Sequence, residues 1–377
     1  MTPASAALPA AAPVRIDLHL VEVPLVAPIR AAHGVEEVRR SILVQATDDA
    51  GTEGWGECVA LARPTYTSEW IDGAWAILRD ELVPAALSGR ASATTGHPMA
   101  AAAVEGALVD LALRREGRSL ASALGVRCER VVSRAVVGLH DSTSSLVDAV
   151  AARLERGHRA AKVKIVPAGA VDALVALRST WPDLDLAVDA NGSLDIRRDA
   201  DLLARLDGLG LSYVEQPFAA TDLVSHAALR RGWTTPIALD ESIVDGGTLS
   251  AAHALGALDL VNLKPARLGG LIAAVGLHDQ LVSLGLGAFC GGMYELGVAR
   301  AAALVLAGRP GLDAPTDLGP SDAYVTRDVT APFVLGADGT IELPTGPGIG
   351  RAPDRARLDE VSVDRWVGEV PRPGRPV

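Results

Sequence analysis

The chain has 377 residues, of which 49% are hydrophobic and 21% are charged. That apolar content excludes a disordered chain, and the length suits two or three domains, or one barrel with an accessory domain. Lys and Arg number 35 against 46 Asp and Glu, and the net charge of −11, without any basic block, argues against nucleic acid and membranes as partners.

Cysteine usage and the first residues bear on the compartment. The three cysteines lie far apart and form no CxxC pair, which predicts a reducing, cytoplasmic environment. The first 17 residues carry neither a charged leader nor a leucine-rich run, so we expect no signal peptide. Apolar runs stay far below the roughly 20 residues that a membrane-spanning helix needs.

The N-terminal third predicts a small mixed domain. Runs rich in β-formers at 14–26, 41–47 and 54–59 indicate antiparallel strands. From 67 to 124 the apolar residues recur at helical spacing instead. Strands followed by helices are typical of an α+β arrangement, so we assign residues 1–133 to an α+β capping domain.

The middle of the chain alternates short apolar runs with amphipathic helical stretches. Eight such runs are expected as strands, at 131–139, 161–166, 184–190, 211–216, 236–240, 258–263, 286–290 and 311–317. Eight strands alternating with helices predict an α/β fold of the (β/α)₈ TIM-like barrel type over residues 134–320. A doubly wound open sheet is the alternative, but no GxGxxG opens a helix and no Walker A motif exists. The Pro- and Gly-rich segment 321–377 is expected to return to the capping domain.

Lysine is rare in this chain. It occurs only as Lys162, Lys164 and Lys264, whereas the other 32 basic residues are arginine. The composition indicates GC-rich coding, which favours arginine wherever the two residues can be exchanged. They cannot be exchanged where the side chain must release a proton, because a guanidinium stays protonated. We therefore predict that the lysines carry proton-transfer chemistry.

Charged residues close five consecutive predicted strands. Lys164, Asp189, Glu215, Asp240 and Lys264 follow one another at intervals of 25, 26, 25 and 24 residues. The active site of a barrel lies at the carboxyl ends of its strands, so this period predicts that all five side chains surround one mouth. Charges in such a partly desolvated place require a partner or a metal.

Three carboxylates without a neighbouring His or Cys ligand favour a hard cation. Mg²⁺ is the expected ion, with Mn²⁺ as another divalent candidate. A ring of salt bridges between the carboxylates and the lysines is the alternative. A bound cation would hold a substrate carboxylate and stabilise the enediolate that forms when a neutral lysine removes the α-proton. Such a lysine needs a lowered pKa, and desolvation and nearby cations act in that direction.

Several motifs resemble a known family. AKVKI, VDANG, VEQP, LDES and NLKPARLGG resemble the muconate-lactonising branch of the enolase superfamily, whose sites pair a Lys or His base with Mg²⁺. EGWGEC, CGGMYELGVAR and PFVLGADG followed by PTGPGIG narrow the resemblance to the o-succinylbenzoate synthase / N-succinylamino acid racemase family, over nearly the whole chain.

The resemblance implies roles for individual residues. It implies that the divalent metal is bound by Asp189, Glu215 and Asp240. It implies that Lys164 and Lys264 are the catalytic acid/base pair. Supporting roles fall to Lys162, which would lower the pKa of Lys164, to Arg267, which would support Lys264, and to Glu241.

Departures from the family pattern concern the substrate pocket. Relatives carry a Thr-Ser-Phe-Gly-like stretch where this chain has Ala-Ala-His-Gly at 31–34, and their strand-seven motif differs where this chain has Tyr294 and Leu296. We expect substrate contacts from four residues near that motif, Gly291, Gly292, Tyr294 and Glu295. The paired glycines would let the backbone approach a ligand closely.

The expected function is abstraction of an α-proton from a small carboxylate substrate by a cytoplasmic lyase. The resemblance implies dehydration to o-succinylbenzoate in menaquinone biosynthesis, with N-succinylamino acid racemisation as the alternative. A non-catalytic metal-binding protein that retains the fold is the alternative from another class. We expect a homo-oligomer that binds neither nucleic acid nor membrane.

Overall fold

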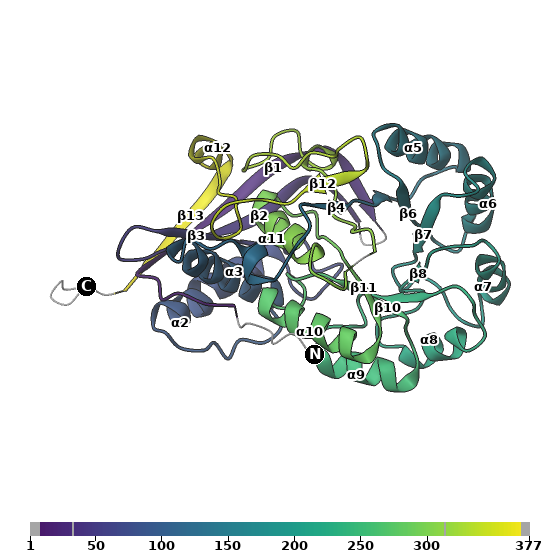
Figure 1. The fold of residues 1–377 in the computed structure, drawn as a ribbon, viewed down its shortest axis with the longest axis horizontal. Coiled ribbons are helices and arrows are strands. Elements are labelled where there is room, and N and C mark those ends of the chain that lie inside the picture. Colours follow the sequence, from purple (N-terminus) through teal and green to yellow (C-terminus); the bar gives the residue numbers. More distant parts are fainter. Residues whose placement is uncertain (1–7, 32–33, 313, 371–377) are drawn as a thin grey trace.

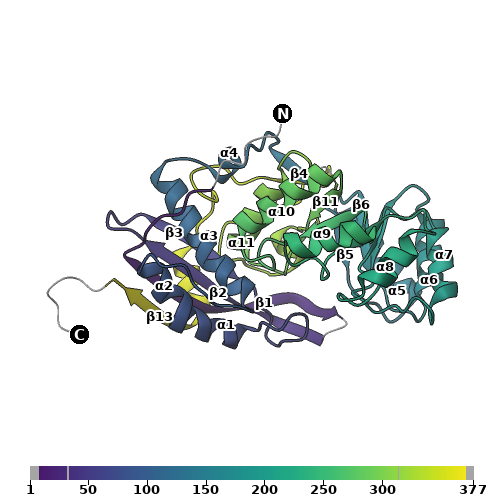
Figure 2. The same cartoon turned by 90° about the horizontal axis from the view of Figure 1, so that it is seen from below.

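The computed structural model describes residues 8–31, 34–312 and 314–370. Two sheets dominate it, one antiparallel and one parallel, and they lie side by side in Figures 1 and 2. The antiparallel sheet has the strand order β13-β1-β2-β3. Its strands are β1 (Arg15–Ala31), β2 (Gly34–Thr47), β3 (Glu53–Cys58) and β13 (Ser362–Glu369). The C-terminal strand therefore completes the sheet that the N-terminal strands begin.

Helices cover one face of this antiparallel sheet. They are α1 (Ile71–Ile77), the π-helical turn Leu78–Leu82, α2 (Val83–Leu87) and α3 (Pro98–Arg115). The short α4 (Leu120–Ala123) instead joins the core of the parallel sheet. Helix α3 lies close against β3 because Gly54 and Gly56 leave room for it: a Cβ on Gly56 would lie 1.9 Å from the carbonyl oxygen of Ala103. The glycines of the EGWGEC motif thus serve close helix–sheet packing.

The two faces of the antiparallel sheet belong to different cores. Ile42 and Val44 on β2 pack with the capping helices, whereas Leu43 between them joins the core of the parallel sheet. Trp55 on β3 joins that second core as well. Alternation along each strand therefore attaches the capping domain to the barrel.

The parallel sheet has seven strands in the order β11-β10-β9-β8-β7-β6-β5 and curls into a half-barrel. The strands are β5 (Ala135–Val137), β6 (Ala160–Lys164), β7 (Asp185–Asp189), β8 (Val214–Glu215), β9 (Ile237–Leu239), β10 (Leu260–Leu263) and β11 (Gly287–Cys290). The helices are α5 (Thr143–Glu155), α6 (Ala170–Thr180), α7 (Ala200–Asp207), α8 (Leu223–Arg230), α9 (Gly246–Leu255), α10 (Leu271–Leu284) and α11 (Gly297–Ala307). The predicted α/β TIM-like barrel with a capping domain is confirmed.

The eighth predicted strand, 311–317, does not form as a strand in its described part. Pro315 cannot donate a ladder hydrogen bond and Gly311 has a φ of +94°, so regular pairing is interrupted. The segment still closes the ring through single hydrogen bonds. The Asp317 N–H donates to the Cys290 carbonyl at 3.0 Å, and the Arg134 N–H donates to the Thr316 carbonyl at 2.8 Å.

The remaining elements of the tail lie on both domains. They are the 3₁₀ turn Ser321–Ala323, β12 (Thr340–Glu342) and α12 (Arg355–Val361). Strand β12 pairs with β4 (Arg130–Val132), next to the barrel, while β13 pairs with β1. Within the described ranges no helix is long and apolar enough to span a membrane.

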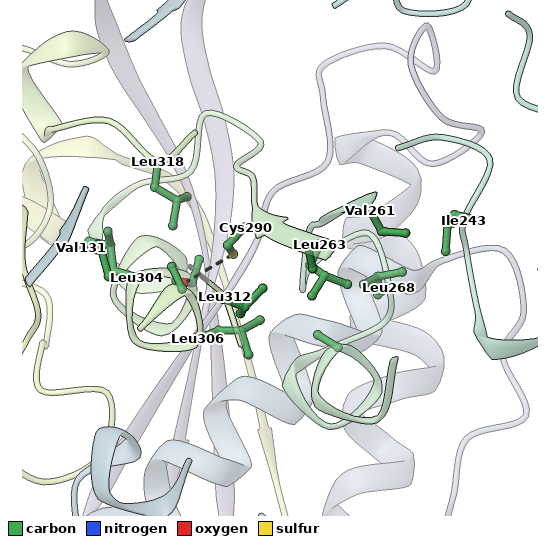
Figure 3. Packing of buried hydrophobic residues seen from close by; sticks show 14 of the residues in the cluster. Val131, Ile243, Val261, Leu263, Leu268, Cys290, Leu304, Leu306, Leu312 and Leu318 are labelled. Carbon is green, nitrogen blue, oxygen red and sulfur yellow. Dashed lines mark hydrogen bonds between the residues drawn. The ribbon is translucent and has the colours of Figure 1, made fainter. Parts of the chain in front are cut away.

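The barrel core continues beneath the strand ends that carry the site. Figure 3 shows Cys290 on β11 beside Leu304 of α11, whereas Leu263 on β10 lies near Val261 and Leu268. The Cys290 Sγ lies 3.5 Å from the Ala303 carbonyl of that helix. Burial raises the pKa of the Cys290 thiol well above its usual range, so this cysteine is a packing residue.

Candidate active site

The charged residues predicted from the period lie at adjacent strand ends. Lys162 and Lys164 are two apart on β6, so both side chains lie on the same face of the strand. Asp189 ends β7 and pairs in register with Glu215, which ends β8. Asp240 directly follows β9, and Lys264 directly follows β10. Both residues belong to the same barrel mouth.

A cavity of about 60 Å³ lies between these strand ends and the segment after β11. Both predicted catalytic lysines line it. The full lining consists of Val136, Lys162, Lys164, Asp189, Lys264, Gly292, Tyr294, Glu295, Asp317, Leu318 and Tyr324. The side chains of Glu215, Asp240, Glu241 and Arg267 lie behind this lining. The structure thus brings the predicted cluster together, with part of it supporting the wall.

Lys164 contacts two oxygen acceptors. Its Nζ lies 3.1 Å from Asp189 Oδ2 and donates to Asn191 Oδ1. The Asn191 amide in turn donates to Glu241 Oε1 at 3.1 Å. Asn191 has a φ of +41°, which is uncommon for a residue other than glycine, and its position links Lys164 to the predicted supporting residue Glu241.

Lys162 is buried between two carboxylates. Its Nζ donates to Glu215 Oε2 at 2.6 Å and also to Asp317 Oδ2. Asn262 holds the other oxygen of Glu215 at 2.8 Å. Lys162 is therefore primarily the counter-charge of Glu215 and Asp317, in addition to its predicted effect on Lys164.

Lys264 shares a carboxylate with two other residues. Its Nζ lies 2.7 Å from Asp240 Oδ2 and 3.1 Å from the Tyr66 hydroxyl, which itself donates to Asp240 Oδ2 at 2.9 Å. Arg267 donates to the second oxygen of Asp240 at 2.8 Å. Arg267 thus contacts Asp240 rather than Lys264, so any support it gives to Lys264 passes through the shared carboxylate.

The lysine pKa values differ in direction from the prediction. Burial alone would lower the pKa of Lys164, but Asp189 and Tyr294 together outweigh it and the pKa is raised. The pKa of Lys264 is likewise raised well above its usual range, because Asp240 acts together with Tyr66, Glu215 and Glu241 against burial. These directions belong to the ammonium–carboxylate pairs alone, whereas the expected lowering counted on a nearby metal cation as well, and it stays a prediction.

The arrangement is a ring of ion pairs. Lysines 162, 164 and 264 face Glu215, Asp189 and Asp240, respectively. In the described ranges, no three His, Cys, Asp or Glu side chains converge as ligands for one ion. Such a ring of salt bridges is the alternative to a metal site that the sequence also allows.

The donor chemistry nevertheless fits a divalent cation. The three carboxylates are at most 4% exposed and supply oxygen ligands only, which Mg²⁺ and Mn²⁺ prefer. Burial, together with repulsion from Asp189 and Asp240, raises the pKa of Glu215 to about 8. Glu241 Oε2 is buried and lacks a hydrogen-bond partner among the described residues. A cation bound by the carboxylates would relieve this crowding of negative charge.

The predicted substrate contacts lie in the segment between β11 and α11. Gly292 lies against the Glu295 carboxylate, since a Cβ would lie 2.7 Å from Glu295 Oε1 and the glutamate would have to shift. Tyr294 has a φ of +57° and its ring lies 5.9 Å from the ring of Tyr324. Gly291 lies against Asn262, outside the lining of the lysine cavity. Residues 32–33, where the sequence departs from the family pattern, lie outside the described residues.

Sequence reasoning missed several residues of the site. Tyr66 lies in the segment between β3 and α1, so it enters the barrel mouth from the capping domain, and no period marks it. Asn191 stands within the VDANG motif, two residues after Asp189, where its polarity was a usable signal. Asp317 ends the last predicted strand, and the structure places it in contact with Lys162.

This chain is similar to known proteins over most of its length. Residues 15–125 match the family model "Mandelate racemase / muconate lactonizing enzyme, N-terminal domain", and residues 145–357 match "Enolase C-terminal domain-like". An N-succinylamino acid racemase from Amycolatopsis sp is 42% identical, covering 94% of this chain and 98% of the relative. An o-succinylbenzoate synthase from Geobacillus stearothermophilus is 37% identical, covering 91% and 94%, respectively.

Solved structures show the same architecture. A probable mandelate racemase from Alicyclobacillus acidocaldarius superposes with a TM-score of 0.86 at 38% identity, covering 94% of this chain and 98% of that one. An enolase superfamily member from Listeria innocua superposes with a TM-score of 0.90 at 31% identity, covering 95% and 99%.

Proposed function

The chain belongs to the o-succinylbenzoate synthase / N-succinylamino acid racemase family of the enolase superfamily, and on that premise we propose that it removes the proton α to the carboxylate of a small-molecule substrate. The observation that carries the proposal is that Lys164 and Lys264 line one cavity from β6 and β10, four positions apart in the sheet. A substrate between them has one lysine on each side.

The residues of this chain divide the work as follows. A divalent cation, when bound by Asp189, Glu215 and Asp240, supplies positive charge to the substrate carboxylate as negative charge develops there. Lys164 acts as general base from its side of the cavity, and Lys264 provides an ammonium on the other. Lys162 is the shared counter-charge of Glu215 and Asp317 and offsets part of their negative charge beside the substrate.

Dehydration to o-succinylbenzoate is the first candidate reaction. Lys164 would take the α-proton of a hydroxycyclohexadiene dicarboxylate and return it to the departing hydroxyl, which leaves as water, while Lys264 stabilises charge. The synthase relatives support this reaction. It would place the enzyme in menaquinone biosynthesis in the cytoplasm.

Racemisation of N-succinylamino acids is the second candidate, favoured by the two opposed lysines. One lysine would take the α-proton and the other would deliver a proton to the opposite face. The racemase from Amycolatopsis sp supports it. Both candidates use the same proton abstraction, so we propose that one site performs both.

The experiment is an assay of both reactions with purified, Mg²⁺-supplemented protein. Formation of the aromatic product is followed by absorbance, and α-proton exchange of an N-succinylamino acid in D₂O is followed by NMR. We expect both signals. A protein that binds the cation but gives neither product nor α-exchange would instead be the non-catalytic metal-binding alternative.

A further inference from the structure

Glu57 is a buried carboxylate of the capping domain that the proposed chemistry does not use. It lies on β3 within the EGWGEC motif and is 3% exposed. In the described part of the chain no Arg, Lys or His forms a salt bridge with it. Its three partners are the Ser41 hydroxyl at 2.9 Å and two backbone N–H groups of the barrel, Leu296 at 2.8 Å and Ala299 at 2.9 Å.

Those two N–H groups are the start of α11. The N-cap position of this 11-residue helix is Leu296, whose side chain accepts no hydrogen bond, so the helix has no cap of its own. Glu57 supplies the cap from the other domain, and Asp328 accepts from the next N–H, that of Gly297, at 2.9 Å. The positive end of a helix dipole stabilises such a carboxylate.

The helix start that Glu57 holds is also the end of the pocket segment. Residues 291–296 connect β11 to α11, and Gly292, Tyr294 and Glu295 from this segment line the cavity with the two lysines. The β11 end is fixed by the hydrogen bond between the Asp317 N–H and the Cys290 carbonyl. Glu57 fixes the other end at Leu296.

A second glutamate of the capping domain acts on the neighbouring barrel helix. Glu105 on α3 accepts from the Ile272 N–H at 3.0 Å, at the start of α10, whose N-cap is Gly270. A Cβ on Gly270 would lie 2.2 Å from a Glu105 oxygen, so the glutamate side chain occupies the space that a side chain at position 270 would need. The capping domain thus holds the starts of two barrel helices that follow site-bearing strand ends.

We propose that Glu57 is a positioning residue, through which the capping domain fixes the segment 291–296 and so the wall of the substrate pocket. The proposal deepens the proposed function and rests on it only for its kinetic consequence. Replacing the carboxylate with an amide turns an acceptor into an N–H that faces backbone N–H groups, and one hydrogen bond to α11 must be lost.

The test compares Glu57→Gln with Asp110→Asn. Asp110 is also a fully buried carboxylate of the capping domain, and it accepts from the Trp55 N–H on the same strand and from the Ile349 N–H, without contacting α11. It therefore controls for loosening of β3. Amide hydrogen exchange of residues 291–299 is measured in both variants and in the wild type.

We expect exchange in 291–299 to accelerate about tenfold in Glu57→Gln, the order of effect of losing a helix cap, and to stay unchanged in Asp110→Asn. Unchanged exchange in Glu57→Gln, or equal acceleration in both variants, would overturn the proposal. Where Glu57→Gln does not fold, Glu57→Asp gives the comparison, because its shorter side chain draws the carboxylate back from the Leu296 and Ala299 N–H groups while keeping the charge.

Steady-state kinetics then test whether Glu57 affects the substrate pocket. With either proposed substrate, Glu57→Gln should raise KM about tenfold with a smaller change in kcat, whereas Asp110→Asn should leave KM unchanged. An unchanged KM in Glu57→Gln would overturn the link to the pocket. The exchange measurement needs no substrate, so it remains decisive even if neither proposed reaction is observed.

Discussion

Tyr66 contacts both Lys264 and Asp240, although it belongs to the capping domain. Tyr66→Phe removes the hydroxyl and leaves the ring, which lies 5.2 Å from the Lys264 Nζ. Hydrogen bonds to charged groups contribute about 1.5–3 kcal/mol, so we expect kcat/KM to fall about 10- to 100-fold. Steady-state kinetics of the purified variant measure this.

Tyr213 provides the matched control for that substitution. Its hydroxyl is buried and has no hydrogen-bond partner among the described residues, and its ring stacks on Phe289 at 4.9 Å. Tyr213→Phe should therefore leave kcat/KM near the wild-type value. Equal losses in the two variants would mean that Tyr66 acts through general packing and not through its contact with Lys264.

Lys164→Arg keeps the positive charge beside Asp189 but removes a group that can release a proton. We expect the fold to persist and α-proton exchange to fall by roughly 10²–10⁴-fold, as for the loss of a general base. NMR in D₂O reports exchange at the α-carbon. Exchange at the wild-type rate would show that Lys164 is only a structural charge.

At the residue scale, the sequence predicts those residues that recur at the barrel period or belong to a rare residue type. The five strand-end charges and the three lysines stand out in the sequence because barrel geometry repeats every βα unit. Tyr66 carried no such mark, since its approach to Asp240 depends on how the capping domain lies on the barrel. The raised pKa of Lys164 also escaped prediction, because it depends on the distance to Asp189.

At the scale of elements, the glycines of the EGWGEC motif explain the close packing of β3 against α3. A Cβ on Gly56 would lie 1.9 Å from the Ala103 carbonyl, and backbone cannot move aside cheaply. Gly56→Ala should therefore destabilise the fold by at least about 2 kcal/mol. Thermal or urea unfolding measures the change.

Gly276 in α10 is the control for that change, because a Cβ there meets no atom within 4 Å. Gly276→Ala should be neutral or stabilise by up to about 1 kcal/mol through helix propensity. If Gly56→Ala were equally harmless, the close approach of β3 and α3 would not be a requirement of the fold.

The strands that follow clear apolar runs form where the sequence predicts them, as β6 and β7 do. The eighth run does not, because Pro315 lacks a donor, and the segment is held instead by separate hydrogen bonds of the Arg134, Thr316 and Asp317 N–H groups. Strand β13 was also hidden, since its pairing with β1 joins residues at opposite ends of the chain.

For the whole molecule, the buried charges predict dependence on a divalent cation. Asp240→Asn removes one carboxylate of the predicted ligand set while keeping its size. We expect Mg²⁺ affinity, measured by calorimetry, to fall at least tenfold with circular dichroism unchanged, and Asp201→Asn on the exposed face of α7 to bind as the wild type does. Full turnover in excess EDTA would contradict the metal requirement.

The central claim is that Lys164 and Lys264 serve opposite faces of one substrate. The direct measurement is α-proton exchange in D₂O, followed by NMR for each enantiomer of an N-succinylamino acid, in Lys164→Ala and Lys264→Ala. Each variant should lose racemisation but still exchange the enantiomer whose α-hydrogen faces the remaining lysine, and the two variants should retain opposite enantiomers. Identical loss of exchange for both enantiomers in both variants, with cation binding intact, would contradict the two-faced site.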